Sequence, residues 1–292
     1  MTGLRGLLWR LFAFVSWLVL PIALSSAWLA TVVTDSDAYV DTVGPLASDA
    51  TVQRVVADRL EGLVVGSVED ATGATLDGGG RDQVGAAVRG ALESPQFESV
   101  WRSANRSAHR QAVGVLEGEQ DGLVTSDGRV GIELGPVYTD VVDVLDERGL
   151  VDAAAVPEVE ATVPLAGAAE LDRAQRIYEL LDAAGFWLPA LWLVLVAATL
   201  LVGPERLRAL RWLAWGSIGG LLLLVAGLLL ARAAVIGEVG SSVDEELVRA
   251  VWDVLVVRLY YAIGAVALVA AVVLVIAAVL GRRRYASETH PA

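Results

Sequence analysis

Four long stretches without a charged residue constrain this chain more than any other feature. They cover 11–34, 183–204, 212–231 and 259–281, and they are 24, 22, 20 and 23 residues long. An α-helix needs about 20 apolar residues to cross the hydrocarbon core of a bilayer. The sequence therefore predicts an α-helical four-span bundle, and the mean hydropathy of +0.57 agrees with a membrane protein.

The first stretch has two interpretations. The segment 25–27, Ser-Ser-Ala, is acceptable as the cleavage site of a signal peptide. The apolar run nevertheless continues to Val33, which is longer than the apolar core of a usual signal peptide. We favour an uncleaved signal-anchor helix at 1–34 and keep cleavage as the alternative.

The distribution of arginine predicts the orientation, because the chain contains no lysine. The N-terminus, the loop 204–211 and the tail 282–292 together carry eight arginines and two acids, a net charge of +6. The segment 34–184 has a net charge of −17, and the loop 232–258 has −2. Basic loops stay on the cytoplasmic side of a membrane. We therefore expect a cell-membrane protein with cytoplasmic termini and with residues 35–182 and 232–258 outside the cytoplasm.

The segment 35–182 has the size of a domain, and its pattern predicts both helices and strands. Capping residues, apolar spacing and the turn signal Asp127-Gly128 indicate the following elements: helices after Asp35 or Ser36, from Ser48, over 82–93, over 94–117, from Pro136 and from about 169 into the second span; a glycine loop over 70–82; a β-hairpin around 127–128; and a third strand over 158–165. These elements predict an extracytoplasmic α+β domain whose core is formed by the hairpin and the helix at 93–118.

The predicted organisation has four parts. An anchor helix at 1–34 precedes the extracytoplasmic domain at 35–182. A three-span membrane domain at 183–281 follows, and its outer loop 232–258 has a helix of its own from Ser242. The chain ends in a basic cytoplasmic tail at 282–292.

The sequence WRSANRSAHR at 101–110 lies in the helix predicted over 94–117 and is the main candidate site. At 100° per residue one arc faces the core, and it contains Phe97, Trp101, Ala104, Ala108, Ala112 and Val115. The polar candidates for contact with an anion or a partner protein are Arg102, Asn105, Arg106, His109 and Arg110. We expect Trp101 to supply core volume and Asn105 to brace a backbone group. Pairing of the arginines with nearby acids is the alternative to ligand binding, and we favour it.

Absent residue types exclude several chemistries. The chain has no cysteine, so disulfides, thiol nucleophiles and thiolate zinc sites are excluded. Without lysine it has no Schiff-base residue and no P-loop. The acidic outer segment argues against nucleic acid as a partner. We therefore predict no catalytic residue, no metal ligand and no cofactor.

Three chemical alternatives stay open in the sequence. A Ser–His–Asp triad through His109 lacks the G-x-S-x-G motif. A pair of carboxylates for glycoside cleavage is compatible with the many acids of the outer segment. Calcium could bind Asp35, Asp37 and Asp41, although helix capping and surface charge explain these residues better.

The spans themselves contain no Asp, Glu, Lys, Arg or His, which argues against a pump or an ion-coupled transporter. Gly216 and Gly220 form a GxxxG motif, and small residues at this spacing allow helices to approach closely. We favour ordinary packing within the bundle and keep a homo-oligomer through these glycines as the alternative.

The order of elements resembles a family of actinobacterial four-span integral membrane proteins with an extracytoplasmic domain. The resemblance covers most of the chain and rests on WRSANRSAH with Trp101, Asn105 and His109, on Leu116-Glu117-Gly118, on GRVGIELGPV, on Pro157 in VPEVEATVPL and on Ala174-Gln175. It implies the topology described above and no established activity.

The sequence thus favours a non-enzymatic role, in which the outer domain is an interaction or sensing module of the cell envelope. Its expected partners are the lipid bilayer and another membrane or envelope protein. Two other functions stay open: a hydrolase of envelope polymers that uses acidic residues, and an accessory subunit of a transport complex.

Overall fold

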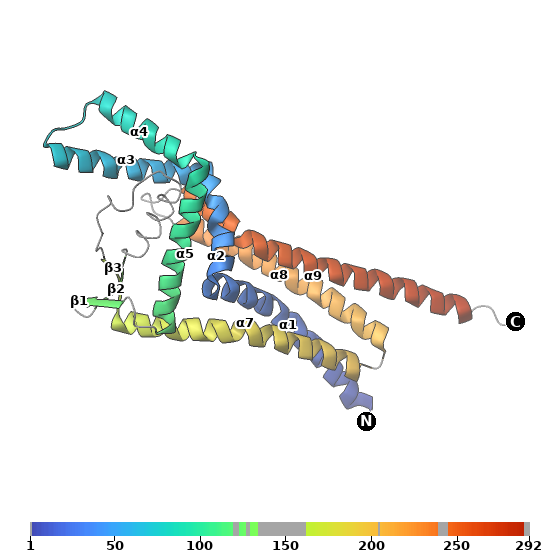
Figure 1. Ribbon diagram of the computed structural model, residues 1–292. Coiled ribbons are helices and arrows are strands. Elements are labelled where there is room, and N and C mark those ends of the chain that lie inside the picture. The colour runs from blue at the N-terminus through green and yellow to red at the C-terminus, as the bar shows by residue number, and fades with distance from the viewer. Residues whose placement is uncertain are drawn as a thin grey trace. The chain divides into compact units, whose positions relative to one another are not determined.

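The computed structural model describes residues 2–118, 123–126, 129–133, 162–203, 205–238 and 245–288. Helices make up most of the described chain (Figure 1). In chain order the elements are α1 (Thr2–Thr34), α2 (Ser36–Val43), the 3-10 helix η1 (Gly44–Ser48), α3 (Ala50–Thr72), α4 (Gly78–Leu92), α5 (Pro95–Glu117), β1 (Leu123–Ser126), β2 (Arg129–Glu133), β3 (Thr162–Gly167), α7 (Ala168–Val202), α8 (Arg206–Glu238) and α9 (Glu245–Glu288).

Four of these helices, α1, α7, α8 and α9, are long and apolar enough to cross a membrane. The apolar segments are Leu4–Thr34, Leu171–Val202, Arg206–Gly237 and Glu245–Leu280. Each coincides with one of the four uncharged stretches of the sequence. The chain thus has the helices of a multi-pass membrane protein, as the sequence predicts.

The chain divides into two compact units, which we call the membrane unit and the head unit. The membrane unit comprises Met1–Thr31, Leu180–Gly237 and Val256–Ala292. The head unit comprises Val32–Glu179 and Glu238–Leu255. Because the boundaries fall inside α1, α7, α8 and α9, each of these four helices contributes residues to both units.

Small residues bring the helices of the membrane unit close together. A Cβ added at Gly216 of α8 would overlap the indole of Trp17 of α1, and one at Gly220 would lie 2.8 Å from the Trp17 carbonyl oxygen. A Cβ at Gly185 of α7 would likewise overlap the Cβ of Ala30 of α1. The two glycines of the GxxxG motif therefore pack against α1 of the same chain, and association between chains stays a prediction.

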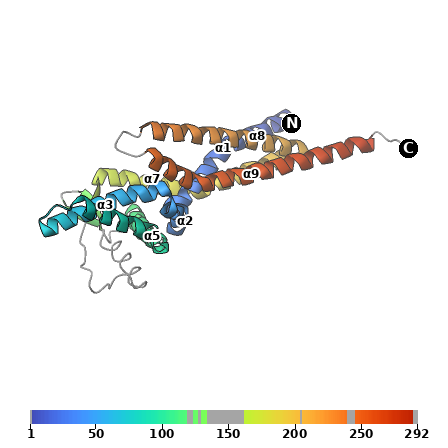
Figure 2. The same cartoon turned by 90° about the horizontal axis from the view of Figure 1, so that it is seen from above.

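The head unit is built around α2, η1, α3 and α5. Helices α3 and α4 lie side by side as a helical hairpin (Figure 1), and α2 lies against α5 (Figure 2). The buried centre consists of Val43, Leu46 and Val52. The partly buried residues packed against it come from α2, α3, α5 and the first turns of α9: Tyr39, Val56, Trp101, Leu247, Ala250, Val251, Val254 and Leu255.

This helical core overturns the expected α+β class of the domain. The three strands are four to six residues long and pair antiparallel in the order β1-β2-β3. The register matches Leu123 with Ile132 and Glu133 with Thr162. The core cluster that the structure describes is built from helices, with Trp101 of α5 packed against it. The predicted α+β domain with a hairpin at its core is therefore wrong, whereas the helix at 93–118 does contribute to the core. The first turns of α9 supply the apolar side chains that we assigned to the hairpin.

Two element boundaries also differ from the predictions. The glycines at 78–80 form the first turn of α4 instead of a loop, because Asp77 caps the helix and its carboxylate accepts from the Gly80 N–H at 2.7 Å. The predicted outer helix and fourth span are one continuous helix, α9. The helix predicted from Pro136 lies outside the described residues.

Candidate site on helix α5

Helix α5 carries every residue of the predicted site, and its ends form as the sequence predicts. Ser94 is the N-cap and Pro95 occupies the first helical position, where a missing N–H costs nothing. Gly118 ends the helix in the left-handed region with φ of 82°, a conformation that glycine adopts without a Cβ clash. The expected buried arc is only partly right, since Ser107 is buried and Ala108 is exposed.

Trp101 fixes α5 to the core of the head unit. Its ring is partly buried against Val43, Leu46 and Val52. Its indole Nε1 donates a hydrogen bond to the Val43 carbonyl oxygen at 3.1 Å. Because that carbonyl belongs to the last residue of α2, the bond joins the end of α2 to the middle of α5.

A row of polar contacts continues along the same two helices, and we call it the α2–α5 seam. The ring of His109 stacks on that of Tyr39 at a centroid distance of 4.2 Å, and its Nδ1 lies 3.0 Å from the Ser36 hydroxyl. Asn105 receives a long hydrogen bond from the Tyr39 hydroxyl at 3.4 Å. Its own Nδ2 donates to the Trp101 carbonyl at 2.8 Å. The Asn105 amide therefore bonds to the backbone of its own helix and not, as we expected, to a neighbouring backbone segment.

Burial lowers the pKa of His109, because desolvation disfavours the charged imidazolium. A backbone hydrogen bond to Val32 and the negative charge of Asp35 act in the opposite direction and are the smaller causes. Burial likewise raises the pKa of the Tyr39 hydroxyl. Burial thus favours the neutral form of both the His109 imidazole and the Tyr39 hydroxyl.

Arg102 and Arg106 form ion pairs across the seam. Arg102 contacts Asp41 of α2 at 3.3 Å and Glu98 of its own helix at 3.2 Å. Arg106 contacts Asp37 at 2.9 Å. These side chains are 35% and 39% exposed, so each pair contributes about 0–1 kcal/mol. Arg110 lies one turn further along and is exposed.

The acids that we considered for calcium have other contacts. Asp35 caps α2, and its Oδ1 accepts from the N–H groups of Asp37 and Ala38. Asp37 and Asp41 pair with the two arginines. Within the described ranges no group of three metal-ligating side chains gathers.

Ser36 and Asp35 both lie near His109, which is the arrangement that a catalytic triad would require. The details do not match the roles, however. The Asp35 carboxylate is used as a helix cap, and the ring of His109 stacks on Tyr39. The contact holds α2 against α5.

The far end of α5 binds the beginning of α7. The Gln175 side-chain Nε2 donates to the Val115 carbonyl at 2.9 Å. The Tyr178 hydroxyl donates to the Glu117 carboxylate at 2.8 Å, and Tyr178 is buried. The sequence pattern does not predict these contacts, because helical periodicity does not relate residues that lie about 60 positions apart.

Two cavities whose linings combine carboxylates with arginines lie along α3 and α4. One has a volume of about 250 Å³ and is lined by Ala50, Gln53, Arg54, Ala57, Asp58, Arg89, Leu92 and Glu93. The other has a volume of about 320 Å³ and is lined by Asp58, Glu61, Gly62, Val65 and Arg81. Both contain two carboxylates beside arginine, which is the feature expected of the alternative hydrolase.

Comparison of the chain with protein-family models, with curated proteins and with solved structures finds no match.

Proposed function

We propose that this chain is a cell-envelope membrane protein whose head unit faces outside the cytoplasm and acts as a non-enzymatic interaction or sensing module. The observation that carries the proposal is the position of α5. One face of α5 bonds to α2, which directly follows the first membrane helix, and its C-terminal end bonds to the start of α7. The core residue Trp101 also shares a cluster with the first turns of α9.

This arrangement links α5 to the chain segments that continue into three membrane helices. A partner that shifts α5 would therefore act on α1, α7 and α9 together. The ion pairs of the seam are exposed and individually weak, so binding of modest strength is enough to rearrange them. A sensing module requires a contact of this kind, strong enough to order the resting state and weak enough to change.

The contact surface that we propose for the partner includes Arg102, Arg106 and Arg110, with Asn105 and His109 behind them. An acidic partner would compete with Asp37 and Asp41 for Arg102 and Arg106. The competition exchanges one exposed carboxylate contact for another. Binding of the partner would thereby be coupled to release of the ion pairs between α2 and α5.

The first test is mild crosslinking and pull-down of the full-length protein from its native membrane. We compare wild type with the double variant Arg102→Ala/Arg106→Ala. The matched control is Arg249→Ala, which breaks an exposed pair with Glu245 at 2.7 Å elsewhere in the head unit. We expect one partner to disappear in the α5 variant and to remain in the control.

A second variant separates partner contact from a purely structural role. Asp37→Ala/Asp41→Ala breaks the same ion pairs but leaves both arginines available. If the arginines contact the partner, capture persists or increases in this variant. Equal loss of capture in both double variants would instead assign the arginines to the fold, and failure to recover any partner would contradict the interaction module.

The α3–α4 cavities support a second candidate, a hydrolase of envelope polymers with Asp58 and Glu93 as its carboxylates. Glycoside cleavage needs two such groups on either side of the scissile bond. The test is hydrolysis of purified envelope polysaccharide by the full-length protein in detergent, with Asp58→Asn and Glu93→Gln as variants. Activity that each variant abolishes would replace the interaction module by an enzyme.

A further inference from the structure

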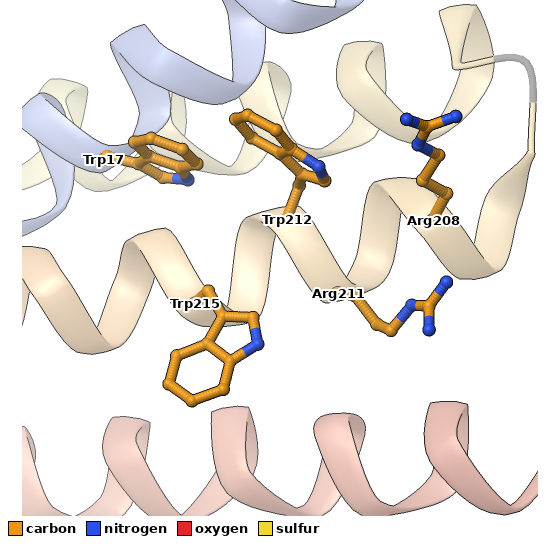
Figure 3. Close-up of a pocket in the computed structure, with 5 residues that line it drawn as sticks. All are labelled: Trp17, Arg208, Arg211, Trp212 and Trp215. Carbon is orange, nitrogen blue, oxygen red and sulfur yellow. The ribbon is translucent and has the colours of Figure 1, made fainter.

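A cavity of about 490 Å³ in the membrane unit combines aromatic walls with two arginines. Its lining consists of Trp17 of α1 and of Arg208, Arg211, Trp212 and Trp215 of α8. The four α8 residues recur at helical spacing and form one stripe. Figure 3 shows Arg208 and Trp212 along one edge of the stripe and Arg211 and Trp215 along the other.

Packing makes the aromatic wall rigid. Trp212 stacks on Trp17 with ring centroids 5.5 Å apart and an interplanar angle of 12°. Trp9 also contacts Trp212, edge to face, with ring centroids 5.9 Å apart. The indole of Trp17 also lies so close to Gly216 that a Cβ there would overlap it. The wall is therefore formed before any ligand arrives.

The two arginines provide positive charge that the described residues do not neutralise. Both side chains are exposed, and within the described part of the chain neither has an ion-pair or hydrogen-bond partner. Arg5 and Arg10 of the same unit differ, since Arg5 donates to the Val202 carbonyl and Arg10 lies over the Trp9 ring. Among the described residues, no group bonds to the guanidinium N–H groups of Arg208 or Arg211, which are therefore open to a ligand.

We propose that this cavity binds the phosphate group of an anionic phospholipid. The guanidinium groups of Arg208 and Arg211 match the geometry of phosphate oxygens. The indole rings contact the glycerol region and the first acyl carbons. The cavity volume lies in the range of small-molecule sites.

The chemistry of the walls favours a lipid over free phosphate. Free phosphate would contact only the two arginines and leave three indole rings against water. A phospholipid supplies the anion and the adjoining apolar carbons in one molecule. The cavity also lies at the start of the uncharged stretch 212–231, where the hydrocarbon core meets the headgroup layer.

The test reconstitutes the full-length protein into phosphatidylcholine vesicles that contain phosphatidylglycerol brominated near the headgroup. Bromine quenches nearby tryptophan fluorescence, and brominated phosphatidylcholine gives the baseline. We expect the wild type to be quenched at a much lower fraction of the anionic lipid than of phosphatidylcholine. Arg208→Gln/Arg211→Gln should weaken this preference by about tenfold, because the variant loses both guanidinium groups that make charge-assisted hydrogen bonds to the phosphate.

The matched control is Arg10→Gln/Arg206→Gln, which removes the same charge from residues that do not line the cavity. The inference requires that this variant keep the preference for the anionic lipid. Equal loss in both double variants would show general attraction to a charged surface and would overturn the inference.

Two further arms distinguish the source of the phosphate and the role of the aromatic wall. Inorganic phosphate at millimolar concentration should leave the quenching unchanged, and full displacement would assign the site to a free anion instead. Native mass spectrometry should detect phosphatidylglycerol retained by wild type and by the control variant. Loss from Arg208→Gln/Arg211→Gln alone supports the site, and retention by that variant contradicts it.

Discussion

At the scale of single residues, Trp101 is the side chain on which the head unit should depend most. It combines a partly buried ring with a hydrogen bond to Val43. Because the ring is only partly buried, we expect Trp101→Ala to lower the free energy of unfolding by about 2–3 kcal/mol, below the range for a fully buried aromatic. Trp101→Phe, which keeps the apolar contact, should lose about 1 kcal/mol.

The measurement is thermal unfolding of the full-length protein in detergent, followed by circular dichroism. Ala108→Ser is a suitable control, because Ala108 lies on the same helix and is exposed. An unchanged melting temperature for Trp101→Ala would contradict the assignment of this residue to the core.

His109 predicts a dependence of stability on pH. Burial lowers its pKa in the folded state below the ordinary value of 6.5, so between the two values the unfolded chain binds more protons than the folded chain. The free energy of unfolding must therefore decrease as the pH falls through 6.5 toward the folded pKa, and it is independent of His109 above that window. Asp35 opposes the shift, and Tyr39 stays neutral throughout.

Melting temperatures between pH 8 and pH 5 test this dependence by difference. The many carboxylates change stability in wild type and variants alike, so the quantity of interest is the gap between them. His109→Gln should lose less stability below pH 6.5 than wild type, whereas His290→Gln, the only other histidine of the chain, should follow wild type. Parallel curves of melting temperature against pH for His109→Gln and wild type would contradict the prediction.

Sequence pattern predicts much of the candidate site at this scale. The helical spacing places Trp101 toward the core, and the structure confirms this; the amide of Asn105 bonds to its own helix and not to a neighbouring backbone segment. The partners of Arg102 and Arg106 could only be named as local acids, because the pattern does not show which face of α2 meets α5. The bonds from Gln175 and Tyr178 depend on tertiary contacts that no local signal contains.

At the scale of elements, close packing of α8 on α1 gives a prediction about glycine. Gly216→Leu should separate the two helices, because a side chain there would occupy the position of the Trp17 indole. The effect should be a loss of about 1–3 kcal/mol, as for overpacked cores. Gly219→Leu is the matched control, since nothing lies within 4 Å of a Cβ at that position.

Tryptophan fluorescence and thermal unfolding in detergent report this change, since Trp17 stacks on Trp212. Gly216→Leu should alter the emission spectrum and lower the melting temperature, and Gly219→Leu should do neither. Equal effects of the two variants would mean that Gly216 does not mediate the contact with α1.

The four spans were predictable as elements, because length and the absence of charge suffice to identify a membrane helix. The fold class of the outer domain was not predicted correctly. The α+β prediction assumed that a segment with a strong hairpin signal also belongs to the core. Turn propensity at Asp127-Gly128 specifies only a local turn and does not show which elements pack together in the core. Apolar residues within 247–255 complete the core. In the sequence they lie in the predicted outer loop between two spans.

At the scale of the whole molecule, charge and helix continuity support the same topology. The acidic residues are concentrated in the segment 34–184, and the arginine clusters follow the opposite ends of the spans. Helices α1, α7, α8 and α9 each continue from the membrane unit into the head unit. An even number of spans would place both termini on one side, and we propose the cytoplasmic side because basic segments favour it.

Single cysteines test this topology directly, because the natural chain has none. Thr75→Cys lies in an exposed position between α3 and α4, and Glu205→Cys lies in an exposed position between α7 and α8. A maleimide that cannot cross membranes should label Thr75→Cys in intact cells and Glu205→Cys only after permeabilisation. Ser16→Cys, buried in the membrane unit, should stay unlabelled in both states and so detects leakage.

The reverse labelling pattern would place the head unit in the cytoplasm. That outcome would refute its role as an extracytoplasmic module while leaving the α2–α5 seam and the arginine cavity of α8 to be judged by their own experiments.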